Sequence, residues 1–227
     1  MSDDSRPTRS ELAQELLSLG TATLGESGGL TMDPSIRPVW LGGGFAGLAC
    51  PVICSAGDNL AIHAALTRAQ AGYVLVVSTG GIPERGYWGE VLTTAAKLAG
   101  IAALVIDGGV RDSASFARHE FPVFARLIAL RGTTKSLPGS VGLPLDIGGV
   151  GVVAGDWVVG DADGVVVVSR SELDAVRAAA IARVAKETQY FEALRAGATT
   201  LELMGVDATQ ISTSWPAEQD AERNQES

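Results

Sequence analysis

The stretch from Trp88 to Asp112 constrains the fold more than any other part of the chain, because it reads as a helix followed directly by a buried strand. A corner at Gly89-Glu90 leads into a helix with apolar periodicity, and residues 103–106 form an apolar run that is typical of a buried strand. The strand ends in Asp107-Gly108-Gly109, where glycine permits backbone conformations that strain other residues. The stretch therefore predicts an α/β fold built around a sheet.

Three charged residues stand at the two ends of this stretch. Glu90 begins the helix, and Arg111-Asp112 follow the strand after twenty intervening residues. Because the helix and the strand return the chain across one edge of the sheet, the three side chains can lie close together. Two carboxylates beside an arginine predict a site for a divalent metal ion and an anionic substrate. The alternative is that Glu90 caps its helix and that Arg111 and Asp112 form an ordinary ion pair.

One domain accounts for the length and composition of the chain. It has 227 residues, of which 46% are hydrophobic, and this is enough to bury one core. We expect the domain to span residues 1–206 and the polar, acidic tail at 207–227 to be disordered. The net charge of −9 and the lack of a basic cluster argue against partners such as nucleic acid or an anionic membrane.

The sequence predicts neither a membrane span nor a secretion signal. Its apolar runs fall short of the roughly 18 residues that a membrane-spanning helix needs. Residues 1–9 are polar, and no apolar segment follows them as it would in a signal peptide. We therefore expect a cytoplasmic protein.

The order of the remaining elements follows from turn residues and apolar periodicity. Thr8 with Glu11, and Ser169 with Glu172, have capping-box spacing, which marks the start of a helix. The predicted elements are helices at 12–19, 59–70 (capped by Asp58), about 111–118 and about 172–197, strands at 45–55, 73–78 and 121–125, and a β-meander of strands at 148–153, 157–159 and 165–168. A helix thus precedes the strands, and the longest helix follows them.

Two apparent ligand-binding motifs are better explained as ordinary turns. Gly42, Gly44 and Gly47 match the spacing of a dinucleotide-binding loop, but no strand precedes them and a strand rather than a helix follows. The segment 161–164 begins like a calcium loop, yet no glutamate closes a loop of twelve residues. Neither segment predicts a nucleotide or calcium site.

Cysteine and histidine do not form an obvious site. Cys50 and Cys54 lie four residues apart in a strand-like run, too far to bond one another, and we expect both to be buried thiols. His63 stands inside a helix without a second metal-ligand residue four positions later, so we interpret it as a structural histidine.

Several motifs in a fixed order resemble one protein family. The motifs are FAGLA at 45–49, GDNLAIHAAL at 57–66, WGEVLTTAAKLAG at 88–100, VIDGGVRD at 105–112, FPVFA at 121–125, GTTK at 132–135 and GDWVVGDADGVVVV at 155–168. From about residue 21 to 206 the chain resembles the family of class II 4-hydroxy-4-methyl-2-oxoglutarate/4-carboxy-4-hydroxy-2-oxoadipate aldolases and the ribonuclease E activity regulator RraA. The resemblance implies a swivelling β/β/α fold with a mixed central sheet, an N-terminal helix and a long C-terminal helix.

Within this family, the charged residues distinguish two classes. Members with aldolase activity resemble one another in having an acidic residue, twenty intervening residues and then Arg-Asp. The regulators tend to have glycine at the first position and an acidic residue three positions after the Arg-Asp aspartate. This chain has Glu90 and Ser115 at those positions, which favours the aldolase class. It departs from the usual pattern in having glutamate instead of aspartate at residue 90.

The resemblance also implies a role for each charged residue. Asp112 would bind Mg²⁺ or Mn²⁺, which prefers oxygen ligands and acts as a Lewis acid on a chelated 2-oxo acid. Arg111 would hold the keto or enolate oxygen, and Glu90 would act through water on the proton of the C4 hydroxyl. The substrate carboxylate would bind backbone N–H groups at the start of the helix, contributed by Gly89, Glu90, Val91 and Leu92.

The implied activity is a retro-aldol cleavage that releases pyruvate, with oxaloacetate decarboxylation by the same route. The implied assembly is a homotrimer or a hexamer of two trimers, in which Glu187 or Glu192 could complete a neighbour's site. One alternative is a non-catalytic regulator that binds a protein partner. Another is a different lyase or hydrolase for 2-oxo acids, in which the Pro83-Glu84-Arg85 segment of the loop at 79–87 adds a charge pair near the distal end of the substrate.

Overall fold

The structure of the protein is a computed structural model, which describes residues 7–212 and 214. The chain divides into two compact units, Met1–Val184 and Ala185–Ser227. The first unit carries the sheet and the candidate site. The second holds the last turns of the long helix α6 and the short helix α7. Most of the tail that we predicted to be disordered lies outside the described residues.

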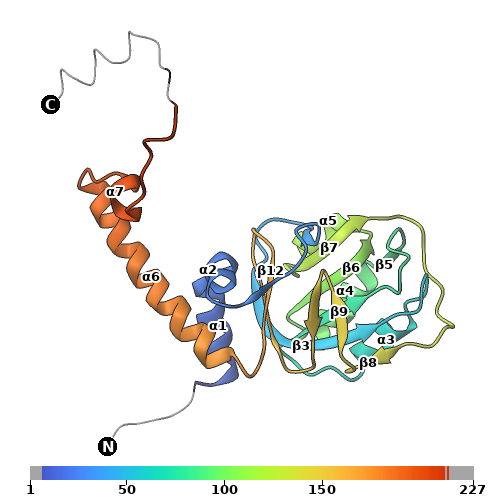
Figure 1. Cartoon of the computed structure of the whole chain (residues 1–227). Helices are drawn as coiled ribbons and strands as arrows, with labels where there is room; N and C mark the ends of the chain where they lie inside the picture. Colours follow the sequence, from blue (N-terminus) through green and yellow to red (C-terminus); the bar gives the residue numbers. More distant parts are fainter. Residues whose placement is uncertain (1–6, 213, 215–227) are drawn as a thin grey trace, which may run out of the picture. The chain divides into compact units, whose positions relative to one another are not determined.

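Helices separate most of the strands between β3 and β7, and the strands from β7 to β12 then follow one another without a helix (Figure 1). The helices are α1 (Arg9–Leu19), α2 (Thr21–Glu26), α3 (Leu60–Leu66), α4 (Glu90–Leu98), α5 (Ser113–Arg118), α6 (Leu173–Arg195) and α7 (Thr200–Met204). The strands are β1 (Leu30–Thr31), β2 (Arg37–Pro38), β3 (Phe45–Ile53), β4 (Tyr73–Ser78), β5 (Gly86–Trp88), β6 (Ala103–Val110), β7 (Val123–Ile128), β8 (Ser140–Val141), β9 (Leu145–Ile147), β10 (Val150–Val152), β11 (Trp157–Gly160) and β12 (Val165–Val168). The α/β class with a long C-terminal helix is confirmed.

The central sheet is mixed, as predicted. Its strand order is β1-β12-β11-β3-β4-β6-β7-β2, with β5 beside the end of β6 and β8 beside the end of β3. The middle strands β3, β4, β6 and β7 are parallel, whereas β11 and β12 join them in antiparallel pairs. Parallel strands are covered on both faces, which explains why β4 and β6 are almost continuously apolar.

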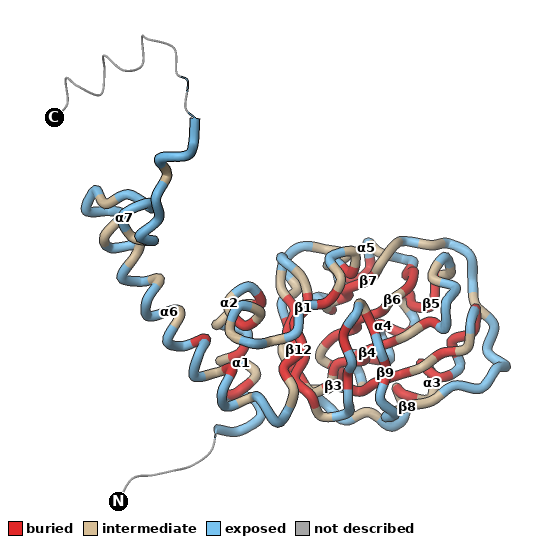
Figure 2. The backbone as a smooth tube through the Cα atoms, viewed as in Figure 1, coloured by how far each residue is buried: buried red, intermediate tan, exposed pale blue. Residues whose placement is uncertain are grey.

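The strands at the middle of the sheet are buried along most of their length (Figure 2), and alternate side chains of β4 belong to two different cores. Leu75 and Val77 of β4 pack in a cluster with α3, α4 and α5. Val74 and Val76 point the other way and pack against the hairpin of β9 and β10. A third cluster joins α1, α2 and the start of α6 to β11 and β12. The helices of the first cluster therefore cover the sheet face on which the candidate site is built.

The predicted three-stranded meander is wrong. β11 and β12 do form an antiparallel pair in the central sheet, but β10 pairs with β9 in a separate two-stranded sheet. The reason lies in the turn between β9 and β10. Gly148 and Gly149 both have positive φ, 54° and 77°, which suits a two-residue hairpin turn and reverses the chain before β11.

Several predicted boundaries also differ from the structure, and for three of them the contacts give the reason. The helix predicted at 59–70 ends at Leu66, where the Thr67 hydroxyl donates to the carbonyl of Ala64 and competes with the helix. The strand predicted at 103–106 continues to Val110, because its end pairs with β5 and β7. The helix predicted from about 111 begins at Ser113, since Asp112 has a left-handed φ of 55°.

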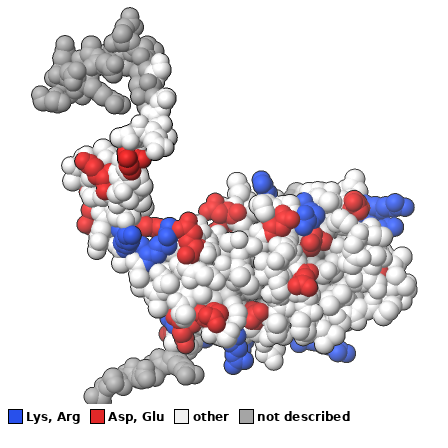
Figure 3. All heavy atoms as spheres, in the orientation of Figure 1, with Lys and Arg blue, Asp and Glu red and all other residues white. Residues whose placement is uncertain are grey.

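Several local predictions are confirmed. Thr8 and Glu11 form the predicted capping box of α1. Cys50 and Cys54 are buried free thiols. No helix among residues 7–212 is long and apolar enough to cross a membrane. On the face drawn in Figure 3, acidic and basic side chains alternate over the first unit instead of gathering by sign.

Candidate active site

A pocket of about 270 Å³ opens beside the amino end of α4. Four segments of the first unit line it. They are Asn59 with His63, the segment from Gly86 to Leu92, the pair Arg111-Asp112, and the segment from Gly132 to Lys135. Gly89, Val91, Leu92, Arg111 and Asp112, all predicted from the sequence, are among the lining residues, and Glu90 is not.

Backbone pairing places Arg111 and Asp112 at this pocket. The Arg111 N–H donates to the carbonyl of Trp88 at 2.8 Å and so ties the end of β6 to the residue before the Gly89 corner. Asp112 Oδ2 then accepts a hydrogen bond from the Glu90 N–H at 3.1 Å. A Cβ atom on residue 89 would lie 2.5 Å from this oxygen, so glycine is required for the Asp112 carboxylate to come this close to the corner.

The Arg111 side chain lies over the same glycine corner. Its Nε is 4.0 Å from Asp112 Oδ2, and the two side chains are 47% and 48% exposed. Its methylene groups pass close to Gly86 and Gly89, where a Cβ atom would lie 3.2 Å from them. The guanidinium and the carboxylate are therefore loosely paired and accessible to a ligand from the pocket.

Glu90 contributes its backbone to the site, but its side chain turns toward α5. The carboxylate is 3.1 Å from Arg118 Nη2 and 3.2 Å from His119 Nε2. The alternative that Glu90 caps its own helix does not describe this geometry, because Gly89 is the N-cap and Asp112 accepts the Glu90 N–H. The structure thus brings the Glu90 backbone, and not its carboxylate, to Asp112.

His63 lies in the pocket wall, where the sequence predicted only a structural histidine. Its Nε2 atom is buried and has no hydrogen-bond partner among the described residues, and the same is true of Asn59 Oδ1. Burial lowers the pKa of His63, the Lys135 ammonium lowers this pKa further, and Asp58 opposes the change. His63 is therefore neutral at pH 7, and its contribution to the pocket is polar but uncharged.

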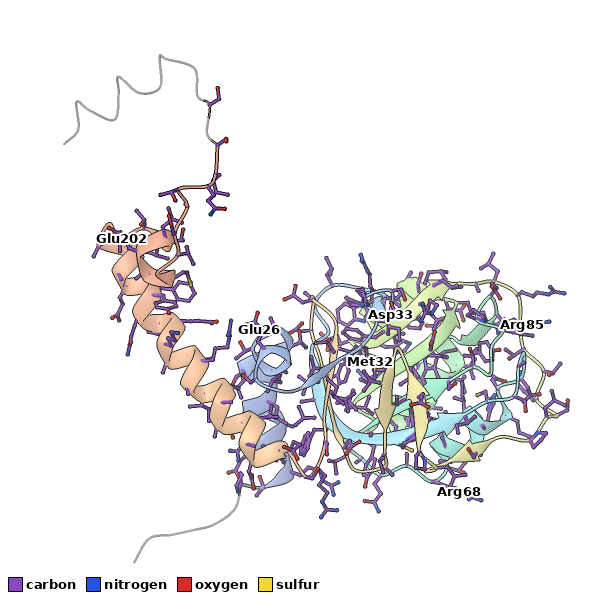
Figure 4. The ribbon with its side chains drawn as sticks, viewed as in Figure 1. Glu26, Met32, Asp33, Arg68, Arg85 and Glu202 are labelled. Carbon is purple, nitrogen blue, oxygen red and sulfur yellow. The ribbon has the colours of Figure 1, made fainter. Side chains whose placement is uncertain are left out.

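Arg85 stabilises the pocket wall by a hydrogen bond, although it does not line the pocket itself. Its Nη1 donates to the carbonyl of Gly132 at 2.8 Å, and it is not among the pocket-lining residues. Figure 4 shows Arg85 at one end of the first unit, well separated from Met32 and Asp33. The predicted charge pair, Glu84 and Arg85, thus does not line the pocket. Arg85 affects the site only through Gly132, which does line it.

The donor atoms at Asp112 fit a divalent cation that keeps most of its other ligands as water or substrate. The carboxylate is a hard oxygen ligand, it lines the pocket, and Gly89 leaves it the space that a side chain would fill. No group of three or more His, Cys, Asp or Glu residues in the described part of the chain could hold a metal ion. A metal at this site would therefore take its remaining ligands from water and substrate.

Comparisons with known proteins show the family of the chain. The family model described as RraA-like, Aldolase/RraA, matches residues 14–167. A protein from Halalkalibacterium halodurans named "Putative 4-hydroxy-4-methyl-2-oxoglutarate aldolase" is 35% identical over 145 residues, which cover 63% of this chain and 69% of that protein.

Solved structures extend the likeness to most of the fold. An uncharacterized protein from Pseudomonas syringae pv. tomato matches with a TM-score of 0.79 at 27% identity, covering 90% of this chain and 97% of that one. Streptomyces coelicolor RraAS2, described as an unusual member of the RNase ES inhibitor RraA protein family, matches with a TM-score of 0.70 at 28% identity, covering 83% and 98%.

Proposed function

Because the chain belongs to the RraA-like family of aldolases and RraA proteins, we propose that it is a metal-dependent pyruvate aldolase. Its substrate would be a 4-hydroxy-2-oxo acid of the 4-hydroxy-4-methyl-2-oxoglutarate type, which it would cleave to pyruvate and a second carbonyl compound. The observation that carries the proposal is the meeting of Arg111 and Asp112 with the amino end of α4 in one pocket. The Arg111 guanidinium and the free amide donors suit the oxygen atoms of a 2-oxo acid, and the Asp112 carboxylate suits a metal ion that the acid would chelate.

The amino end of α4 provides a site for the substrate carboxylate. The N–H groups of Val91 and Leu92 lie in the first turn and have no acceptor in the described part of the chain, whereas that of Glu90 is taken by Asp112. Orphan amide donors and the helix dipole favour an anion at this position. The 2-oxo oxygen would then lie toward Arg111, whose planar fork binds oxygen anions well.

Asp112 would hold Mg²⁺ or Mn²⁺. When bound, the cation supplies Lewis-acid polarisation of the 2-oxo group, an effect worth several kcal/mol. Arg111 stabilises the oxygen that gains negative charge when the C3–C4 bond breaks. In this proposal the Glu90 carboxylate turns from Arg118 and His119 toward the pocket. There it acts through a water molecule on the proton that leaves the C4 hydroxyl as this carbon becomes a carbonyl, and a proton returned to C3 completes pyruvate.

The same bond cleavage predicts a second activity. In oxaloacetate the C3–C4 bond joins the pyruvoyl part to a carboxylate, so its cleavage releases CO₂ and leaves the same enolate at Arg111. We therefore propose oxaloacetate decarboxylation as a side activity of this site.

The test is pyruvate release, coupled to lactate dehydrogenase, from 4-hydroxy-4-methyl-2-oxoglutarate and separately from oxaloacetate. Each substrate is assayed with Mg²⁺, with EDTA, and with the variants Glu90→Ala and Asp112→Ala. Asp163→Ala is the matched control, because Asp163 is exposed and does not line the pocket. Metal-dependent turnover that both site variants lose and the control keeps is the expected result.

The other outcomes point to other functions. Decarboxylation without aldol cleavage would mean that the natural aldol substrate is different. The likeness to RraAS2 supports one further candidate, a non-catalytic regulator that binds a protein partner. Folded protein that neither binds Mn²⁺ nor turns over either substrate would favour the regulator, whereas Mn²⁺ binding that Asp112→Ala abolishes would count against it.

A further inference from the structure

Two groups of the next helix hold the Glu90 carboxylate away from the pocket. Its Oε1 lies 3.1 Å from Arg118 Nη2 and 3.2 Å from His119 Nε2. The side chains of Arg118, Glu90 and His119 are 61%, 45% and 29% exposed. Ion pairs with this much exposure are weak, and each changes an equilibrium constant by about fivefold or less. The carboxylate can therefore leave this position with a small loss of free energy.

The backbone of Glu90 is fixed, so only its side chain has to move. The Glu90 N–H donates to Asp112 Oδ2 at 3.1 Å, and the Glu90 carbonyl accepts from the Thr94 hydroxyl at 3.0 Å. Gly89 and Val91, on either side of it, line the pocket. Rotation about the side-chain bonds of an exposed residue takes on the order of nanoseconds or less and needs no change in the helix. Glu90 can thus alternate between α5 and the pocket.

The partners on α5 are held in place by contacts of their own. Arg118 Nη1 donates to the carbonyl of Ala114 at 3.2 Å, within the same helix. The His119 N–H donates to the Ser115 carbonyl at 2.9 Å, and the His119 carbonyl accepts from Lys97 Nζ in the last turn of α4. None of these contacts uses the carboxylate at residue 90. Arg118 and His119 therefore keep a resting position available for it.

The charge at Asp112 decides which position the Glu90 carboxylate prefers. Because the Glu90 N–H already binds Asp112, a Glu90 carboxylate that faces the pocket lies near a second carboxylate, and like charges repel. A divalent cation at Asp112, together with the Arg111 guanidinium beside it, reverses the sign of this interaction. The Glu90 carboxylate is therefore expected at α5 before a cation binds and in the pocket afterwards.

We propose that Arg118 and His119 are positioning residues, which hold the Glu90 carboxylate outside the pocket until a divalent cation and a 2-oxo acid are bound. The inference rests on the proposed function, since Glu90 acts there on the C4-hydroxyl proton from inside the pocket. It also gives the glutamate at residue 90 a role, because an aspartate is one methylene shorter and reaches less far toward α5. The two residues lower kcat, which depends on the fraction of complexes in which Glu90 has entered the pocket.

Pyruvate release from 4-hydroxy-4-methyl-2-oxoglutarate measures this effect. Arg118→Met is expected to raise kcat about twofold to fivefold with little change in KM, and Arg118→Lys should return kcat toward the wild-type value. In a Glu90→Asp background the same change should have no effect, because the shorter side chain loses the contact. Arg131→Met, which removes an exposed cation that does not line the pocket, is the control. A kcat that Arg118→Met lowers or leaves unchanged would overturn the inference.

Nuclear magnetic resonance tests the contact without turnover. The chain has two histidines, so a His119→Gln variant identifies the ring resonances of His119. At fixed pH these resonances should shift in Glu90→Gln, and they should shift in the same direction when the wild type binds Mg²⁺ and oxalate, which resembles the enolate of pyruvate. Ligand binding seen by calorimetry with no shift at His119 would overturn this inference and leave the aldolase proposal standing. Failure of both ligands to bind would overturn both.

Discussion

Replacement of Asp58 by asparagine is expected to destabilise the protein in a way that depends on pH. The carboxylate is buried, which raises its pKa, but the hydrogen bonds from Leu60, Ser136, Thr134 and Leu137 outweigh burial and lower the pKa from the ordinary 3.8 to about 2 in the folded protein. A shift of this size, at about 1.4 kcal/mol per pKa unit, corresponds to a stabilisation of about 2 kcal/mol. Because the folded pKa is the lower one, this stabilisation is complete above the unfolded pKa and is lost as the pH falls through the folded pKa.

The measurement is urea unfolding of the wild type and of Asp58→Asn at fixed protein concentration and at several pH values. The difference in unfolding free energy should be about 2 kcal/mol at pH 7 and pH 5, about half of that at pH 3, and close to its minimum at pH 2. Asp163→Asn is the control, because the exposed Asp163 carboxylate makes no hydrogen bond or ion pair with the other described residues. A difference that stays constant down to pH 2, or that is absent at pH 7, would refute the reasoning.

Three further predictions concern the glycine corner and the core. Gly89→Ala should weaken Mn²⁺ binding about tenfold or more, because its Cβ would displace the Asp112 carboxylate; paramagnetic resonance titration measures this, and unchanged affinity would contradict it. Thr93→Val should cost about 1–3 kcal/mol and lower the thermal midpoint, since the buried Trp88 indole N–H loses the acceptor it reaches at 2.8 Å; an unchanged midpoint would argue against the bond. The Cys54 thiol should react with Ellman's reagent at pH 8 only after unfolding, because burial raises its pKa to about 12, and rapid reaction of the native protein would show the opposite.

The elements that were predicted well are those whose signals are local. The capping box of α1 needs only Thr8 and Glu11, and the apolar runs of β4 and β6 report strands that are covered on both faces. The predicted meander failed because strand patterns do not say which strands pair. Gly148 and Gly149, both with positive φ, form the turn that pairs β10 with β9 instead of β11.

The candidate site, too, was predicted where the signal is local and missed where it is not. The spacing of Glu90 and Arg111-Asp112 predicted that a helix start and a strand end would meet, and the structure brings the Glu90 N–H to Asp112. The direction of the Glu90 side chain could not be predicted, because its partners Arg118 and His119 come from the following helix. The spacing carries information about the backbone and little about rotamers.

The sequence by itself determined the α/β class, the capping box of α1 and the corner at Gly89, because each depends on residues that are neighbours along the chain. Only the tertiary structure decided what faces the pocket. Asp58 and Thr134 are 76 positions apart, and their hydrogen bond brings Lys135 to the site through strand order and loop closure. Such contacts form only when the whole sheet is assembled, since the free energy that holds them comes from burial shared by distant segments.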